Sequence, residues 1–154
     1  MPDEILIERD VDPATGAVTR TITEHLDSNG DVVFTTTDYD KSGGIVRKVI
    51  ERHLRPKSGD VSERWNLVER ITLDYSDDGR TVWRETVETF GNGVNETPQT
   101  KSETDWVVDK TVPGGRWRRF VRFYHWEEKP AGHWVQDTTY EFNQDGTIKA
   151  VTHP

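Results

Sequence analysis

The sequence contains no cysteine, which excludes disulfide bonds, thiolate metal ligands and cysteine nucleophiles. It also has no apolar run near the roughly 20 residues that a membrane-spanning helix requires. The first ten residues, MPDEILIERD, lack the basic start and the apolar stretch of a secretory signal peptide. We therefore expect a protein that does not enter a membrane and is cytoplasmic, or is exported without a cleavable signal peptide.

Positive charge and apolar residues are also scarce. The 20 Lys and Arg residues are outnumbered by 28 Asp and Glu residues, which gives a formal net charge of -8. An acidic surface repels nucleic acids and anionic membranes but attracts basic proteins. Residues 1–154 have the length of a single domain, yet only 32% of them are hydrophobic. We therefore expect a core that is thin or shared with a partner.

One short motif occurs four times. Its pattern is T-x-(D/E/H)-(Y/F/L)-(D/S/N)-x-x-G, and its copies span residues 23–30, 36–43, 72–79 and 139–146. Asp, Asn or Ser at the start of a type I turn accepts hydrogen bonds from backbone amides, and the glycine readily adopts a left-handed conformation. The motif predicts a three-residue hairpin loop closed by a glycine bulge. Three copies also fit a two-residue type I′ turn, and residues 12–16 form a longer turn of the same kind.

Between the turns, apolar and polar residues alternate with the period of a strand. The sequence predicts an all-β domain without a convincing helix, and sequential strands joined by tight turns form an antiparallel meander. Strand 45–54 carries apolar residues on both sides. This mixing indicates a sheet curled into a barrel or half-barrel, or an open single-layer sheet covered by a partner. We favour the closed or nearly closed form. The ten expected strands are 5–9, 17–26, 31–39, 45–54, 61–75, 80–90, 102–112, 116–129, 133–143 and 147–152.

The stretches TTDYDKSGGIVRKV and TLDYSDDGRTVWRE resemble the tyrosine–aspartate hairpins of RHS/YD-repeat proteins, whose strands carry the pattern Y-D-x-x-G. The resemblance covers the four turns and their flanks, which is under half of the chain. In that family the repeats wrap into a large shell around a toxin, and this chain is too short to form one. Three copies also depart from the pattern, with Leu26 and Phe142 in place of Tyr and with Ser76 and Asn143 in place of Asp.

The stretch RWRRFVRFYHWEEK, residues 116–129, interleaves arginines with aromatic residues in an otherwise acidic chain. Such a mixture suits a protein-binding hot spot, and it can also stack bases and hold phosphates. A third interpretation is a central strand whose arginines pair with acids on neighbouring strands. Strand alternation splits the arginines between two faces, which disfavours nucleic acid. The candidate partner-binding residues are Arg116, Trp117, Arg118, Arg119, Arg122, Tyr124 and Trp126.

Six tryptophans are many for a chain of this length. In a sequence poor in Leu and Ile, large rings supply buried area, so most of them are expected in the core. On the inside of a barrel they would instead line a pocket for a small apolar ligand, as in lipocalin-type carriers. The candidate ligand-binding residues are Trp65, Trp83, Trp106 and Trp134.

Patterns that indicate catalysis or metal binding are weak. His125 and Glu127 alternate onto one face and His133 begins the next strand, and two histidines with a carboxylate can bind zinc. No supporting motif accompanies them, so we interpret them as solvated neighbours of a turn. We predict no catalytic residues, no metal and no cofactor.

These observations favour a non-enzymatic protein-binding or assembly module. In one version it is a structural subunit that binds copies of itself through sheet edges and the aromatic strand. In the other it is an acidic inhibitor or immunity-type protein that masks a basic partner. The alternative is the lipocalin-like barrel that binds a small apolar ligand.

Overall fold

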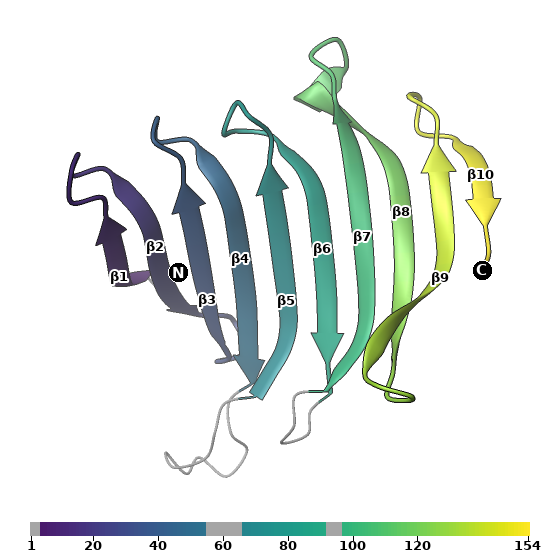
Figure 1. Ribbon diagram of the computed structural model, residues 1–154, viewed down its shortest axis with the longest axis horizontal. Helices are drawn as coiled ribbons and strands as arrows, with labels where there is room; N and C mark the ends of the chain where they lie inside the picture. Colours follow the sequence, from purple (N-terminus) through teal and green to yellow (C-terminus); the bar gives the residue numbers. More distant parts are fainter. Residues whose placement is uncertain (1–3, 55–65, 92–96) are drawn as a thin grey trace.

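The computed structural model describes residues 4–54, 66–91 and 97–154. Ten strands form one antiparallel sheet in which the spatial order equals the chain order (Figure 1). One short 3-10 turn, Pro113–Gly115, precedes the eighth strand. The strands are β1 (Ile5–Val11), β2 (Val18–Leu26), β3 (Val32–Tyr39), β4 (Ile45–Leu54), β5 (Asn66–Tyr75), β6 (Val82–Phe90), β7 (Pro98–Val108), β8 (Arg116–Glu127), β9 (His133–Phe142) and β10 (Ile148–Thr152).

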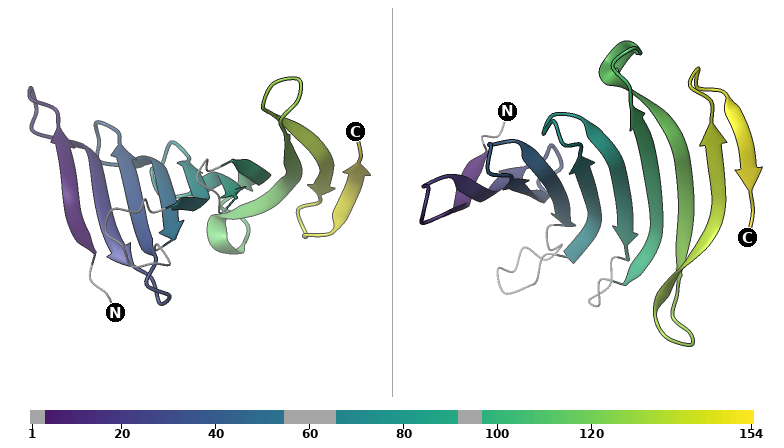
Figure 2. Two further views of the ribbon diagram at one scale, coloured as in Figure 1. Left: turned by 90° about the horizontal axis from the view of Figure 1, so that it is seen from below. Right: turned by 45° about the horizontal axis from the view of Figure 1, so that its top comes forward.

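The predicted ten-stranded meander is confirmed, and its sheet is open. Strands β1 and β10 lie at opposite edges and do not pair with each other (Figure 1). The sheet twists strongly from one edge to the other (Figure 2). The sheet does not close into a barrel, and the structure agrees with the open-sheet or half-barrel forms that the sequence also predicted. No helix in the described part of the chain has the length and apolar character of a membrane span.

The hairpin turns follow the motif. In three copies the carbonyl of the first turn residue accepts a hydrogen bond from the glycine amide, and its own amide donates to the carbonyl four residues ahead. In one copy, for example, Gly43 donates to Asp40, and Asp40 donates to Gly44. This is the bulged loop that the sequence predicts. In the copy at residues 72–79, the turn begins at Ser76 and its amide donates to the carbonyl of Thr81, so the loop is one residue longer. The motif glycines all have positive φ, between 68° and 90°.

One face of the sheet, here called the charged face, carries a row of alternating charges. Cross-strand partners run in order from β1 to β7, so each acid is flanked by arginine. The Nε atoms of Arg20, Arg47 and Arg84 each lie 2.7–2.8 Å from a carboxylate oxygen. Opposite charges on neighbouring strands stabilise the pairing. The row, here called the charge ladder, consists of Asp10, Arg20, Asp38, Arg47, Asp74, Arg84 and Asp105.

The opposite face, here called the apolar face, carries β-branched and aromatic side chains. One row across it consists of Thr35, Ile50, Ile71, Val87, Ser102 and Phe123. Only seven apolar side chains of the described residues are buried, and none of their large side chains is fully buried. The buried apolar side chains lie on both faces. They form two small groups, Val32, Val33, Leu67, Val68 and Phe90 near one end of strands β3, β5 and β6, and Val121 and Phe142 on β8 and β9.

Asp105 is the most strongly held member of the charge ladder. Arg84 donates two hydrogen bonds to its carboxylate, at 2.7 and 3.2 Å, and Arg122 donates a third at 2.8 Å. Partial burial opposes ionisation, but the bonds from both arginines outweigh it and lower the pKa of Asp105. The carboxylate is therefore charged at neutral pH and holds strands β6, β7 and β8 together.

We expect Gly79→Val to destabilise the fold by about 1–3 kcal/mol or more. Gly79 has φ +68°, and an added Cβ would lie 2.6 Å from the Cα atom of Gly44 in the neighbouring turn. Gly146 has φ +90° with no atom within 4 Å of an added Cβ, so Gly146→Val carries only the conformational strain. Urea unfolding compares the two variants. Equal losses would show that the contact between the turns contributes nothing.

We expect Asp105→Asn to lower the free energy of unfolding at neutral pH by roughly 1–3 kcal/mol, because two arginines lose their charged acceptor. Asp38→Asn, at a more exposed pair, should cost less than about 1 kcal/mol. A carboxylate with a lowered pKa stabilises the fold above its unfolded pKa, which is about 3.9. The deficit of Asp105→Asn should therefore shrink as pH falls below that value. A deficit independent of pH in urea titrations would contradict this account.

Candidate functional site

Strand β8 lies inside the sheet, between β7 and β9 (Figure 1). Two of its candidate residues point to the charged face and bind acids of β7. The Arg122 guanidinium lies 2.8 Å from Asp105, and the Tyr124 hydroxyl donates a 2.6 Å hydrogen bond to Glu103. Partial burial, this hydrogen bond and the charge of Glu103 raise the pKa of Tyr124 to about 12. The pairing of arginine with acids on a neighbouring strand is therefore confirmed at Arg122.

A β-bulge changes the expected facing of Arg118. Strict alternation places Arg118 on the face of Arg122, but the register shifts where Asp105 pairs with Phe120 and Trp106 with Arg118. Arg118 instead lines the same hollow as Val121 and Phe123, on the apolar face. Its guanidinium carbon lies 4.0 Å from the centre of the Phe142 ring. The expected alternation is thus wrong at this end of β8, because a bulge inserts one residue into the count.

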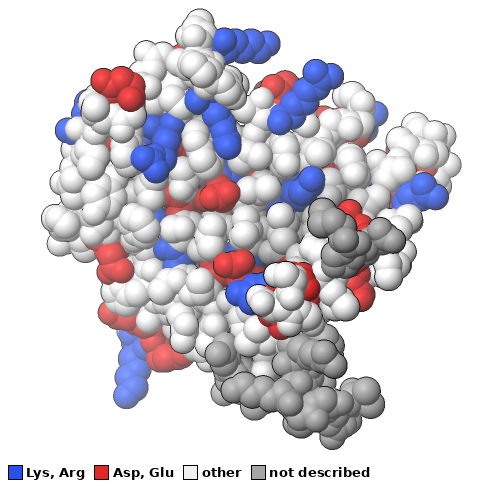
Figure 3. Space-filling model, turned by 180° about the vertical axis from the view of Figure 1, so that it is seen from behind, with Lys and Arg blue, Asp and Glu red and all other residues white. Residues whose placement is uncertain are grey.

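The remaining arginines of β8 lie over aromatic rings. Arg116 lies 3.9 Å from the ring centre of Trp106 and also donates a 2.6 Å hydrogen bond to the carbonyl of Val82. Arg119 lies 5.2 Å from the ring of Phe120. On the face shown in Figure 3, Lys and Arg side chains are interspersed with Asp and Glu. The positive charge of β8 is divided between the two faces, since Arg122 binds Asp105 on the charged face and Arg118 lies over Phe142 on the apolar face. Trp117 is the cross-strand partner of Val107.

A shallow apolar hollow of about 400 Å³ lies on the apolar face beside the β10 edge. Phe123 has 42% of its surface exposed there, and its ring makes an edge-to-face contact with Tyr140, with centroids 6.0 Å apart. The sequence analysis did not single out Phe123, although it stands within the aromatic stretch. Phe123 could have been found from its spacing of two residues from Val121, because residues two apart on a strand lie on the same face. The hollow is lined by Arg118, Val121, Phe123, Tyr140, Phe142 and Ile148.

The other aromatic candidates gather on the charged face near the β8–β9 turn. Trp126 and Trp134 are cross-strand partners with an edge-to-face contact at 5.2 Å. The Lys101 ammonium lies 4.4 Å from the Tyr124 ring centre and 5.0 Å from that of Trp134. Gly132 lies against the indole, since an added Cβ would be 2.5 Å from a carbon of Trp126. These contacts form an ordered cluster of rings around one cation.

The four candidate ligand-binding tryptophans do not line one site in the described residues. Trp65 lies outside those residues. Trp83 and Trp106 lie on β6 and β7 beneath Arg84 and Arg116. Trp134 belongs to the ring cluster on the charged face. The open sheet therefore separates side chains that a closed barrel would bring together.

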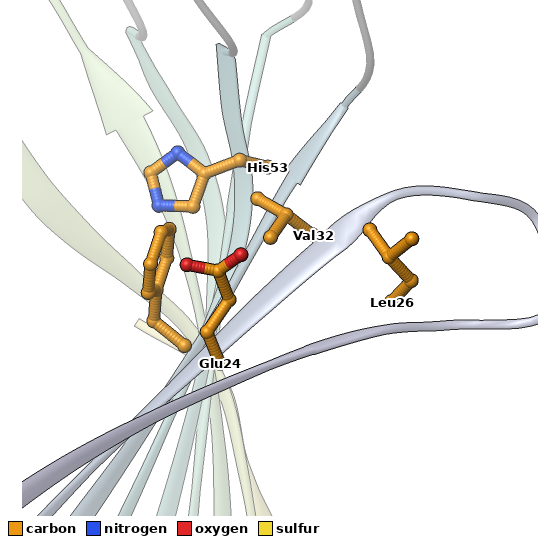
Figure 4. A pocket seen from close by; sticks show the side chains of 5 residues that line it. Glu24, Leu26, Val32 and His53 are labelled. Carbon is orange, nitrogen blue, oxygen red and sulfur yellow. The ribbon is translucent and has the colours of Figure 1, made fainter. Parts of the chain in front are cut away.

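A second hollow, of about 370 Å³, lies on the charged face at strands β2–β4. Figure 4 shows Glu24 and His53 pointing toward each other, with Val32 beside them and Leu26 farther away. The fifth lining residue, Phe34, makes an edge-to-face contact with His53 at 5.4 Å. Sequence analysis missed this hollow, because cross-strand register brings its residues together from three strands.

His125 is held between two carboxylates. Its Nδ1 atom lies 2.6 Å from Asp137, and its Nε2 atom lies 2.9 Å from Glu127. The bonds to Glu127 and Asp137 raise the pKa of His125. His133 lies farther away, with Nε2 4.0 Å from Glu127. Among the described residues, no three His, Asp or Glu side chains are arranged to hold a metal ion.

Comparison with known proteins gives little further information. No family model and no curated protein matches the sequence. A crystal structure of a protein of unknown function from Bacteroides fragilis is similar, with a TM-score of 0.41 and 9% identity, over 91% of this chain and 92% of that one. A similarity at this level carries no argument about function.

We expect Glu127→Gln to lower the pKa of His125, because the neutral amide no longer stabilises the imidazolium. The control is Glu128→Gln, which removes an exposed acid at the next position. A raised histidine pKa stabilises the fold below the unfolded value of about 6.5, and this stabilisation is lost as pH rises through the folded pKa. NMR titration of the imidazole protons measures the midpoints. Identical midpoints in the two variants would contradict the contact with Glu127.

Proposed function

We propose that the protein is a non-enzymatic protein-binding or assembly module that presents the apolar face of an open sheet. The observation that supports this proposal is the incomplete burial of that face. Domains usually bury the apolar side of a sheet beneath a second layer. Here the described strands form a single sheet, and only seven apolar side chains are buried.

The side chains of β8 suit recognition. Arginine and aromatic residues contribute most of the energy in many protein interfaces. In this strand Arg118 is held over Phe142, and Phe123 against Tyr140, before any partner binds. Side chains that are already ordered lose less conformational entropy on binding. The apolar hollow, with its single arginine at the rim, is therefore the centre of the proposed interface.

Self-assembly is favoured over masking of a basic protein. The net charge of -8 attracts basic partners, but ladder acids such as Asp74 and Asp105 are already paired with arginines of this chain. Paired acids contribute less to attraction at long range. A small apolar ligand is disfavoured because the sheet is open and the candidate tryptophans are separated.

We expect the weight-average mass to rise with protein concentration in static light scattering, and Phe123→Ser to weaken this association roughly fivefold. The expected loss is on the order of 1 kcal/mol, because part of the ring is already buried in the free chain. Phe120→Ser removes a similar ring from the opposite face and should leave association unchanged. Thermal melting confirms that both variants fold.

A monomer at every concentration would reject self-assembly and leave a basic partner as the version to test. Equal effects of Phe123→Ser and Phe120→Ser would show that the apolar face is not the interface.

A further inference from the structure

Both edge strands are open and apolar. Strands β1 and β10 each have one neighbour among the described strands, so one side of each presents unpaired backbone groups. Among the described residues, eleven large hydrophobic side chains are exposed, and six of them lie on these two short strands. Such edges are templates for a further strand. Both edges also carry charged side chains, such as Glu8, Asp10 and Lys149, and these restrict which strand can pair with them. The six exposed hydrophobic side chains are Ile5, Leu6, Ile7, Val11, Ile148 and Val151.

We propose that strand β10 of one copy pairs antiparallel with strand β1 of the next copy, so that one sheet continues through the assembly. The inference rests on the proposed function and specifies that the binding partner is a second copy of this chain. Neighbouring strands of the meander alternate in direction, so β1 and β10 point in opposite directions (Figure 1). A second copy in the same orientation therefore presents β1 antiparallel to β10, with each face continuing on its own side.

Charge and facing are both compatible with a register in which Val151 lies opposite Arg9. Val151 and Arg9 both lie on the apolar face, opposite Tyr140 and Thr21 of their own chain. Placing them opposite each other brings Ala150 opposite Asp10, both on the charged face. Lys149, whose ammonium lies 3.6 Å from Glu141, then stands beside Asp10 of the next copy. The alternation of the charge ladder, which begins at Asp10, thus continues across the junction.

Pairing of β1 with a second β1 is opposed by charge. Two antiparallel copies of β1 are related by a two-fold axis normal to the sheet, which pairs residues of the same face. In a register centred on Arg9, Arg9 lies opposite Arg9 of the other copy, and Glu8 lies opposite Asp10. Registers centred on Glu8 or Asp10 set each of those acids against itself. Like charges directly opposite destabilise a strand pair. The acidic strand β1 is therefore suited to a different strand, and β10 carries the lysine.

The junction also joins two hollows on the apolar face. One, of about 400 Å³, includes Ile148 at the β10 edge, and the other, of about 370 Å³, includes Leu6 and Arg9 at the β1 edge. The proposed register brings Ile148, which is 56% exposed, close to Val11 of the next copy, which is 50% exposed. Head-to-tail contacts of this kind generate rings or filaments.

Cysteine cross-linking tests the register directly, because the natural chain contains no cysteine. A disulfide requires Cβ atoms about 3.5–4.5 Å apart. Under mild oxidation, a mixture of the Arg9→Cys and Val151→Cys variants should give a covalent dimer, and each variant alone should give none. In the matched control, Thr152→Cys replaces Val151→Cys, and the mixture should not cross-link because Thr152 lies on the charged face.

Light scattering gives a second, independent measurement. Lys149→Glu should weaken association roughly fivefold or more, because an acid then stands beside Asp10. Lys41→Glu makes the same change of net charge at an exposed turn residue and should have little effect.

Each outcome decides a different claim. Cross-linking of either single variant with itself would overturn the head-to-tail pairing. Association without cross-linking of the mixture, and without an effect of Lys149→Glu, would overturn the register but keep the proposed function. A chain that is monomeric at every concentration would overturn the strand pairing and the self-assembly version of the proposed function, and would leave the version with a basic partner.

Discussion

The structure depends on pairing between neighbouring strands, because a single sheet has no second layer to hold it. Backbone hydrogen bonds join the strands, and side-chain pairs fix their register. The charge ladder adds a specific constraint, since a slip of one residue would move every ladder side chain to the opposite face. Exposed ion pairs contribute little individually, but Asp105 joins two arginines and spans three strands. Within the charge ladder, Asp105 is therefore held more strongly than the exposed pair of Arg20 and Asp38.

The repeated motif encodes both the turn and part of the ladder. Its fifth position and its glycine form the hairpin loop, as at Asp40 and Gly43. Its third position supplies the ladder acids Asp38 and Asp74. An arginine on the strand after the glycine pairs with each of them, Arg47 with Asp38 and Arg84 with Asp74. The same residues therefore specify where the chain turns and which residues face each other afterwards. Sequence analysis recognised the first role and missed the second, because turn chemistry is local and the ion pairs join residues on different strands.

The strands themselves were predictable, since turns bound them on both sides. For nine of the ten strands, each end that the structure describes lies within two residues of the expected position, as at β4 and β9. Strand β7 spans Pro98–Val108 instead of the expected 102–112. Proline is tolerated at the first residue of a strand, and the strand ends where Asp109 begins the next turn. Bulges were not predictable, and one of them placed Arg118 on the apolar face. The hollows were not predictable either, because each combines residues from several strands.

The strand order has a consequence for how the chain acquires its shape. Every strand pairs only with the strands beside it in sequence, so the sheet behaves as a one-dimensional array. Contacts between hairpin neighbours require closure of short loops, which favours rapid folding for an all-β chain. Structure can nucleate at any hairpin and spread toward both ends. Evolution can likewise lengthen or shorten such an array by whole hairpins while the remaining strands keep their neighbours.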